Sequence, residues 1–239
     1  MIFHWYGFFL GLGIVCGIAA AQWFVSRIDS KLSKHIDALS LWVVIGGVIG
    51  ARLYHLATDW QLYVGASFFD LIAVWRGGLG LWGAIVGGLF GLFLYAKKHF
   101  NSLKSFMLLV DGVVFGLPIA QAIGRIGNGI NQEIFGKITT LPWGIFINNS
   151  TEKYHPLFAY ESILLLVFWI SLRWAIVKNK VSIGNGNIFA LWMITYGLIR
   201  FCLEYLRYST AQLGIFSVAQ WVSMVAIILG FFVLKKMRI

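Results

Sequence analysis

Long apolar runs alternate with short polar connections along this chain. Seven of these runs are long enough to cross a bilayer, which takes about 20 residues in a helix. They cover roughly Trp5–Val25, Leu39–Leu56, Gly78–Tyr95, Phe106–Ile123, Pro156–Leu172, Gly186–Leu203 and Val218–Leu234. Backbone polar groups inside a bilayer must bond to one another, so each run is predicted to be an α-helix.

The composition agrees with a protein that lies almost entirely in a membrane. Hydrophobic residues make up 59% of the 239 residues and charged residues only 12%, whereas about 25% of a soluble domain is charged. Mean hydropathy is +0.81. We therefore predict an all-α integral membrane protein of about seven helices, with residues 1–239 forming one polytopic domain. The first run lacks a basic leader and an Ala-x-Ala cleavage site, so it is expected to be retained.

The distribution of lysine and arginine predicts the orientation. Alternate connections hold three basic residues each, which together are twelve of the 19 in the chain. These are Arg27, Lys31, Lys34, Lys97, Lys98, Lys104, Arg173, Lys178, Lys180, Lys235, Lys236 and Arg238. Such residues stay in the cytoplasm, so we expect the N-terminus outside and the C-terminus inside. The asymmetry explains most of the net charge of +10, and no nucleic-acid binding is expected.

The most distinctive segment, from Gly124 to Gly136, reads Gly-Arg-Ile-Gly-Asn-Gly-Ile-Asn-Gln-Glu-Ile-Phe-Gly and follows the fourth apolar run. Charge at a membrane boundary is costly unless it is paired or used. Glycines let a backbone approach a ligand closely, and arginine binds phosphate through two parallel N–H groups. We therefore predict a site for an anionic head group. Arg125 would hold the phosphate, Asn128 would orient hydroxyl groups, and Glu133 would contact an arginine or a hydroxyl group.

Other charged residues are expected near the same outer face. The seven remaining basic residues all fall there: Arg52, Arg76, Arg125, Lys137, Lys153, Arg200 and Arg207. Tyr196, Arg200 and Glu204 are spaced by four residues and share one helix face. An arginine and a glutamate at this spacing can also form a purely structural ion pair. Asp111 lies near the inner end of its helix, where we expect a polar contact between helices.

Together these residues resemble the prolipoprotein diacylglyceryl transferase family. The segment from Gly124 to Gly136 is similar to the family's most specific motif. Less specific similarities follow in order along nearly the whole chain. They are Trp5-Tyr6-Gly7, Gly50-Ala51-Arg52-Leu53-Tyr54, Gly77-Gly78-Leu79, His155-Pro156 with Tyr160-Glu161-Ser162, and Tyr196-Gly197-Leu198-Ile199-Arg200-Phe201 with Glu204 and Arg207.

The resemblance implies a multi-pass enzyme of the bacterial inner membrane. It would transfer a diacylglyceryl group from phosphatidylglycerol to the lipobox cysteine thiol of prolipoproteins, the first step of lipoprotein maturation. Its partners would be phosphatidylglycerol, prolipoprotein signal peptides and membrane lipid, without a metal or other cofactor. The expected catalytic residues are Arg125, Arg200 and Tyr6. The expected substrate-binding residues are Arg52, Arg125, Asn128, Glu133, Tyr196, Arg200 and Glu204.

One position departs from the family pattern. After Gly77-Gly78-Leu79 the family usually has a histidine or tyrosine before a glycine, whereas Trp82 precedes Gly83 here. An indole cannot accept a proton. The acceptor thiol, with an ordinary pKa of about 8.5, could ionise beside two arginines. Alternatively His4 could accept the proton, or the chain could be an inactive relative.

A function from another class is also compatible with outward-facing arginines. They would suit a binding or transport protein for a phospholipid or an organic anion. Against this, the seven runs show no inverted repeat, and Asp111 is nearly alone among polar residues toward the inner side. The transferase is therefore the favoured hypothesis.

Overall fold

The computed structural model describes residues 5–74, 78, 80–100, 102–147, 150–208 and 212–236. Outside this range lie His4, Arg76, Gly77, Leu79, Arg238 and the side chain of Trp82, for which the sequence carries expectations. The chain divides into two compact units. Unit 1 comprises Met1–Ile28 and Met107–Ile239, and unit 2 comprises Asp29–Phe106. Each unit is described by itself.

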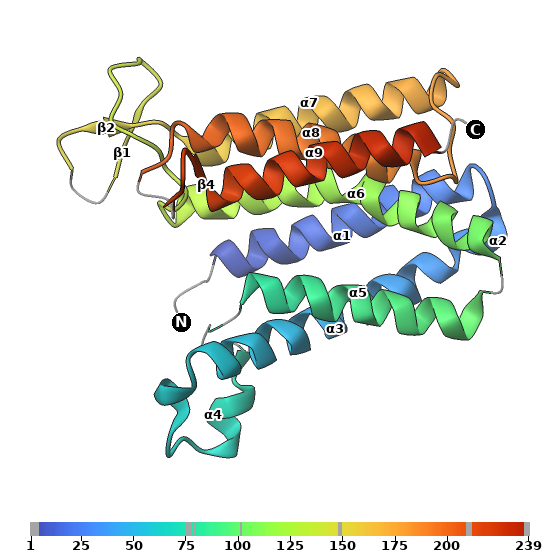
Figure 1. The fold of residues 1–239 in the computed structure, drawn as a ribbon, viewed down its shortest axis with the longest axis horizontal. Helices are drawn as coiled ribbons and strands as arrows, with labels where there is room; N and C mark the ends of the chain where they lie inside the picture. Colours follow the sequence, from blue (N-terminus) through green and yellow to red (C-terminus); the bar gives the residue numbers. More distant parts are fainter. Residues whose placement is uncertain are drawn as a thin grey trace. The chain divides into compact units, whose positions relative to one another are not determined.

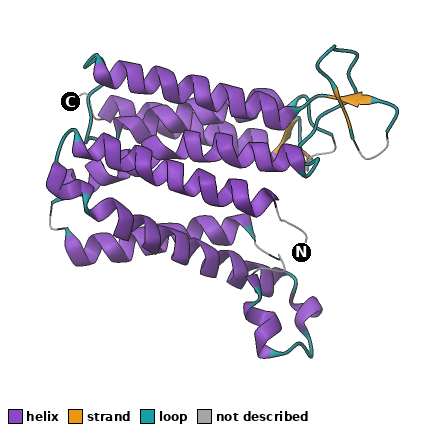
Figure 2. Cartoon of the chain, turned by 180° about the vertical axis from the view of Figure 1, so that it is seen from behind, coloured by secondary structure: helices purple, strands orange, loops and turns teal. Residues whose placement is uncertain are grey.

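Unit 1 is a group of long helices that lie side by side (Figure 1). They are α1 (Trp5–Ser26), α6 (Leu103–Ile130, of which the first turn belongs to unit 2), α7 (Leu157–Val177), α8 (Asn187–Glu204) and α9 (Val218–Lys236). Two antiparallel ribbons lie at one end of these helices, as the orange arrows in Figure 2 show. Their strands are β1 (Ile145–Phe146), β2 (Lys153–Tyr154), β3 (Gln212–Leu213) and β4 (Phe216–Ser217).

Unit 2 is built on two long helices that approach each other through glycines. Its elements are α2 (Ser30–Ser33), α3 (His35–Thr58), the 3-10 helix η1 (Trp60–Tyr63), α4 (Phe68–Ile72) and α5 (Leu81–His99). A β-carbon at Gly87 would collide with the carbonyl oxygen of Gly46, so this close approach of α3 and α5 depends on small residues. The connection between them was expected to be a loop. Instead it contains η1 and α4, and a capping box of Ser67 and Asp70 begins α4.

Six described helices are long and apolar enough to cross a membrane. They are α1, α6, α7, α8, α9 and the continuous stretch Ser30–Thr58 that includes α3. This agrees with the prediction of an all-helical membrane protein. The strands in the described part of the chain are each two residues long. The 19-residue helix α5 corresponds to the remaining apolar run.

The predicted end of the fourth apolar helix is wrong. The apolar run ends at Ile123, but α6 continues to Ile130 and includes the first half of the glycine-rich motif. Polar residues can extend this helix because their side chains find partners on neighbouring elements, as described below. Glycine lowers helix propensity by about 1 kcal/mol, and tertiary packing outweighs that cost here.

Among the described residues, apolar contacts join α1 to α6 and join α6 to α7 and α8. Between α1 and α6, the rings of Phe24 and Phe115 stack with centroids 5.2 Å apart. Gly17 and Gly116 allow the same two helices to approach closely. A second cluster joins α6, α7 and α8 near the ribbon end; its buried members are Ala122, Leu157, Leu165, Ile199 and Leu203.

Asp111 fastens the opposite end of α6 to the beginning of α8. The side chain is fully buried. Its Oδ2 accepts the N–H groups of Gly184 at 3.0 Å and Gly186 at 3.1 Å, and its Oδ1 accepts that of Phe189 at 3.3 Å. Gly186 and Phe189 lie at the start of α8, where helix donors have no partner within the helix, and Gly184 lies just before it. The expected polar contact between helices is thus confirmed, and its form is a cap supplied from another helix.

Asp111→Ala should strongly lower the melting temperature of the detergent-solubilised protein. Three backbone N–H groups would lose their acceptor, and each unsatisfied buried donor costs about 1–3 kcal/mol. Asp111→Asn retains one carbonyl oxygen and should melt between wild type and Asp111→Ala. Circular dichroism during heating measures this order, and identical melting curves for all three proteins would contradict the capping role.

Candidate active site

The glycine-rich motif ends α6 in a tight reversal of the chain. The N–H of Glu133 donates to the carbonyl of Asn128 at 2.8 Å, and the N–H of Gln132 donates to that of Gly129 at 3.1 Å. Gln132 has a left-handed φ of 55°. These are the two hydrogen bonds of a Schellman motif. The reversal brings Glu133 back beside the last helical turn, so residues from both halves of the motif meet.

Arg125 lies at the centre of a polar network. Its Nη2 donates to Oε1 of Glu161 at 2.7 Å, and its Nη1 donates to Oδ1 of Asn128 at 3.3 Å. Glu161, on the second turn of α7, is only 3% exposed. A buried carboxylate requires such a charged partner. The Nε of Arg125 is also buried, and it has no hydrogen-bond partner within the part of the chain that the structure describes.

The network continues from Asn128 to Glu133. The Nδ2 of Asn128 donates to Oε2 of Glu133 at 2.8 Å, and the Nδ2 of Asn131 donates to Oε1 at 3.2 Å. Glu133 therefore contacts two amides, whereas the sequence suggested an arginine or a hydroxyl group. The carboxylate that pairs with Arg125 is Glu161. The sequence reasoning did not select Glu161 as a site residue. The signal that could have found it is its position between Tyr160 and Ser162, in a segment that resembles the family.

A second group of charges follows one face of α8. Nη1 of Arg200 lies 2.9 Å from Oε2 of Glu204, as the four-residue spacing predicted. Oε1 of Glu204 accepts the hydroxyl of Ser217 at 3.1 Å. Nη1 of Arg207 lies farther from Oε2, at 3.9 Å. One buried carboxylate is thus shared unequally by two guanidinium groups.

Tyr196 connects the two groups of charges. Arg125, Arg200 and Glu161 all lie close enough to its hydroxyl group to act on it electrostatically. Its ring stacks on Trp192, with centroids 5.3 Å apart. Residues from α6, α7 and α8 therefore contribute to one site at the ribbon end of unit 1.

Tyr6 reaches the same site from α1. A β-carbon added to Gly127 would lie 3.3 Å from both the Cα and the ring Cδ2 of Tyr6, so glycine allows the tyrosine to pack on the motif. Tyr6 is 39% exposed and remains accessible. Of the residues predicted for the site, unit 1 thus brings together Tyr6, Glu133 and the members on α6 and α8.

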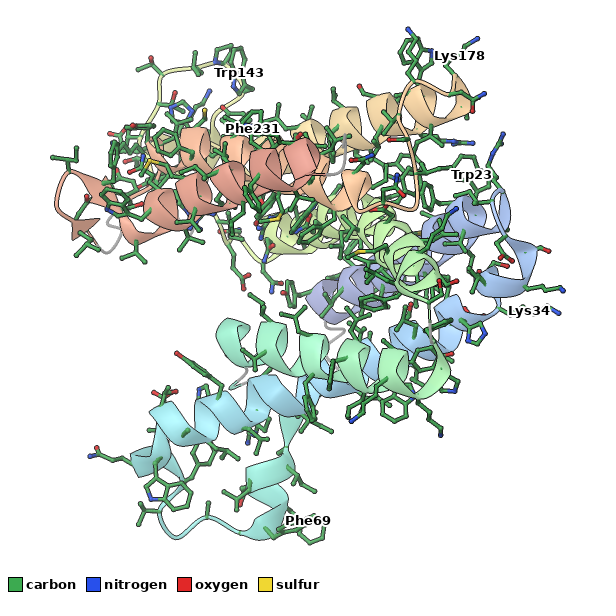
Figure 3. All side chains as sticks on the ribbon, turned by 45° about the vertical axis from the view of Figure 1, so that its right-hand side comes forward. Trp23, Lys34, Phe69, Trp143, Lys178 and Phe231 are labelled. Carbon is green, nitrogen blue, oxygen red and sulfur yellow. The ribbon has the colours of Figure 1, made fainter. Side chains whose placement is uncertain are left out.

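A short extension lies at this end of unit 1. We call residues 131–147 and 150–156, which contain β1 and β2, the cap segment. Gly136 forms an isolated bridge with Arg207, and a β-carbon there would lie 2.5 Å from the carbonyl oxygen of Leu206. Farther along the cap segment, Nε1 of Trp143 donates to the hydroxyl of Tyr160 at 2.8 Å. Figure 3 shows Trp143 and Lys178 at opposite ends of α7.

Arg52, which was expected at the substrate site, belongs to unit 2. Its buried guanidinium donates to the carbonyls of Leu71 at 2.7 Å, Asp70 at 2.5 Å and Gly78 at 3.1 Å. It also lies 5.1 Å from the ring centroid of Tyr63. Arg52 thus holds the end of α4 and the segment that leads to α5.

Comparison with known proteins finds one family and many relatives. The prolipoprotein diacylglyceryl transferase family matches residues 1–235. A Streptomyces coelicolor protein named phosphatidylglycerol–prolipoprotein diacylglyceryl transferase 1 is 38% identical over 83% of this chain and 60% of its own length. The transferase of that name from Mycolicibacterium paratuberculosis is 38% identical over 84% of this chain and 52% of its own length. The transferase of that name from Synechococcus elongatus is 35% identical over 95% of this chain and 81% of its own length. The chain thus spans between half and two thirds of the first two relatives.

Glu161→Gln should destabilise the protein, because Arg125 would lose the charge that compensates its own. Breaking a buried ion pair from one side costs about 3–5 kcal/mol. The double variant Arg125→Met/Glu161→Leu leaves no unpaired charge and should recover much of the lost melting temperature. Glu152→Gln, at an exposed position of the cap segment, is the matched control. If the double variant is less stable than Glu161→Gln, the two residues are not an energetic pair.

Proposed function

The chain belongs to the prolipoprotein diacylglyceryl transferase family, and we propose that it transfers a diacylglyceryl group from phosphatidylglycerol to the lipobox cysteine of prolipoproteins. One observation carries the proposal. The guanidinium of Arg125 is fixed by Glu161 at the end of a membrane helix, while its buried Nε has no partner in the described part of the chain. Such a donor suits a phosphodiester oxygen.

The two arginines divide the work on the phosphate. The phosphodiester oxygens accept hydrogen bonds from two guanidinium groups. Arg125 donates from its Nε side, and Arg200 donates from the N–H groups that Glu204 does not use. As the bond between the glyceryl carbon and its phosphate oxygen breaks, negative charge grows on the departing phosphate. Preorganised cations stabilise this charge more strongly in the transition state than in the substrate. Glu161 and Glu204 hold the two guanidinium groups in place.

The neighbouring residues orient the lipid and the acceptor. Asn128 and Glu133 offer polar groups to the glycerol hydroxyls of the head group, and Tyr196 contributes its hydroxyl beside both arginines. Tyr6, which is accessible on the surface of the motif, contacts the reacting groups from α1. The acceptor thiol loses its proton in the field of Arg125 and Arg200, which favours the thiolate.

Arg52 supports substrate binding indirectly, by holding backbone groups of unit 2 in place. Its guanidinium holds the carbonyls of Asp70 and Leu71 at the end of α4 and the carbonyl of Gly78. We place both units in one membrane domain of seven spans, with α5 as the third. The substrates and partners are phosphatidylglycerol, prolipoprotein signal peptides and the surrounding lipid of a bacterial inner membrane.

The basic residues support an orientation with the site outside. Arg27 and Arg173 both lie over the ring of Trp23, at 5.3 and 4.8 Å, and Figure 3 shows Trp23 at the same end of unit 1 as Lys178. The Arg125 site lies at the opposite end. Because the basic end faces the cytoplasm, the site opens on the side where prolipoproteins emerge.

Arg125→Ala and Arg125→Lys should each reduce the transfer rate about 100-fold or more, because one donor to a developing negative charge is worth about 3 kcal/mol. Lysine keeps the charge but lacks the planar fork of arginine. The measurement is lipobox-peptide-dependent release of labelled glycerol phosphate from head-group-labelled phosphatidylglycerol. A serine-for-cysteine peptide and the variant Lys153→Gln are the controls. Near-wild-type activity of Arg125→Lys would contradict two-pronged phosphate binding.

The orientation can be tested by thiol labelling. In a background with Cys16→Ala and Cys202→Ala, Lys153→Cys in the cap segment should react with a membrane-impermeant maleimide in intact spheroplasts. Lys178→Cys, at the other end of α7, should react only after lysis. Labelling in the reverse order would show that the site faces the cytoplasm.

A further inference from the structure

A polar cavity lies next to the candidate active site in unit 1. Its volume is about 500 Å³, and its walls include Lys137, Glu204, Arg207 and Gln220. These residues come from the cap segment, from the end of α8 and the turn after it, and from the first turn of α9. Glu204 also belongs to the ion pair with Arg200. The cavity therefore adjoins the phosphate-binding residues and is separate from Arg125.

Gln220 points to a ligand in this cavity. The side chain is only 4% exposed, and its Oε1 accepts the N–H of Ser217 at 3.0 Å. This bond fixes which way the amide is turned. The remaining donor, Nε2, is buried without a hydrogen-bond partner in the described part of the chain. A buried donor without an acceptor is unfavourable, so a bound molecule that supplies an acceptor oxygen would complete the site.

The charges of the cavity favour an anion. Lys137 forms no ion pair with any residue that the structure describes, and Arg207 lies 3.9 Å from a carboxylate that Arg200 holds at 2.9 Å. Burial, and then the nearby Arg200, lower the pKa of Arg207 from the usual arginine value. Two cations and an amide donor therefore surround the cavity, against one shared carboxylate.

The proposed reaction produces an anion of the matching kind. The acceptor sulfur forms a bond to the glyceryl carbon, and the bond from that carbon to the phosphate oxygen breaks. The electron pair stays on this oxygen, and the thiol proton leaves to solvent. A phosphodiester with one negative charge thus becomes a phosphate monoester, whose charge approaches two because its second pKa is about 6. The product needs more positive charge around it than the substrate does.

We propose that this cavity binds the glycerol phosphate that leaves during transfer. The inference rests on the proposed function and extends it to the fate of the head group. Glu204 links the two places, because it contacts Arg200 on the phosphatidylglycerol side and Arg207 on the cavity side. Lys137, Arg207 and Nε2 of Gln220 hold the monoester, and Glu204 accepts a glycerol hydroxyl. The released head group then moves away from the reacting carbon before the next lipid enters.

Calorimetric titration of the purified full-length protein with racemic glycerol 1-phosphate tests this assignment. Wild type should bind one equivalent. Lys137→Gln removes one cation, and Gln220→Glu keeps the acceptor for Ser217 while it replaces the free donor with a negative charge. Each should weaken binding roughly 10-fold or more, the effect of losing one charge-assisted hydrogen bond. Lys153→Gln removes a lysine of the cap segment that lies outside the cavity walls. It should change the affinity for glycerol phosphate by less than about twofold.

Two results would overturn the proposal. One is unchanged affinity in both Lys137→Gln and Gln220→Glu, with melting curves that show folded proteins. The other is inorganic phosphate binding as tightly as glycerol phosphate, which would mark a general anion site. Transferase activity is measured separately on the same wild-type preparation. Turnover without glycerol phosphate binding refutes the cavity assignment alone, whereas absence of turnover refutes the proposed function.

Discussion

The buried carboxylate of Glu161 must have a positive charge beside it, and the ribbon end of unit 1 is organised around this requirement. Arg125 lies on the last turns of α6, and its partner Glu161 lies on the second turn of α7, so these two helix ends must meet. The apolar cluster of α6, α7 and α8 holds them at that distance. Without Arg125, the carboxylate of Glu161 would be desolvated without a compensating charge. The pair also fixes the guanidinium of Arg125 in one orientation, as the proposed phosphate binding requires.

A second carboxylate, that of Glu204 on α8, is paired with two arginines instead of one. Glu204 is held closely by Arg200 and more loosely by Arg207, and Ser217 orients its other oxygen. One carboxylate for two arginines leaves positive charge available to a ligand. Along unit 1, the groups proposed to bind phosphate therefore continue from Arg125 through Arg200 toward Arg207. This continuity is the physical basis for assigning both a substrate site and a place for the departing head group.

Much of the fold follows from the apolar runs, since α1 and α9 begin at the predicted residues. The end of α6 could not be predicted from the apolar runs. Glycines and charged residues usually end a helix, whereas here contacts with neighbouring elements allow the helix to continue. The connection in unit 2 was also missed, since elements as short as η1 and α4 leave no periodic signal. The pairing of Arg125 with Glu161, 36 positions apart, cannot be derived from local spacing. The Arg200–Glu204 pair could be predicted, because helix periodicity brings residues four apart together.

The most direct test of the proposed transferase activity is mass spectrometry of a lipobox peptide after incubation with phosphatidylglycerol and the purified protein. The peptide should gain one diacylglyceryl group on its cysteine sulfur, through a thioether that resists mild base. A peptide with serine in place of that cysteine should stay unmodified. No mass gain from a folded preparation that binds phosphatidylglycerol would contradict this activity. A gain of a single acyl chain on an ester or amide would contradict it equally.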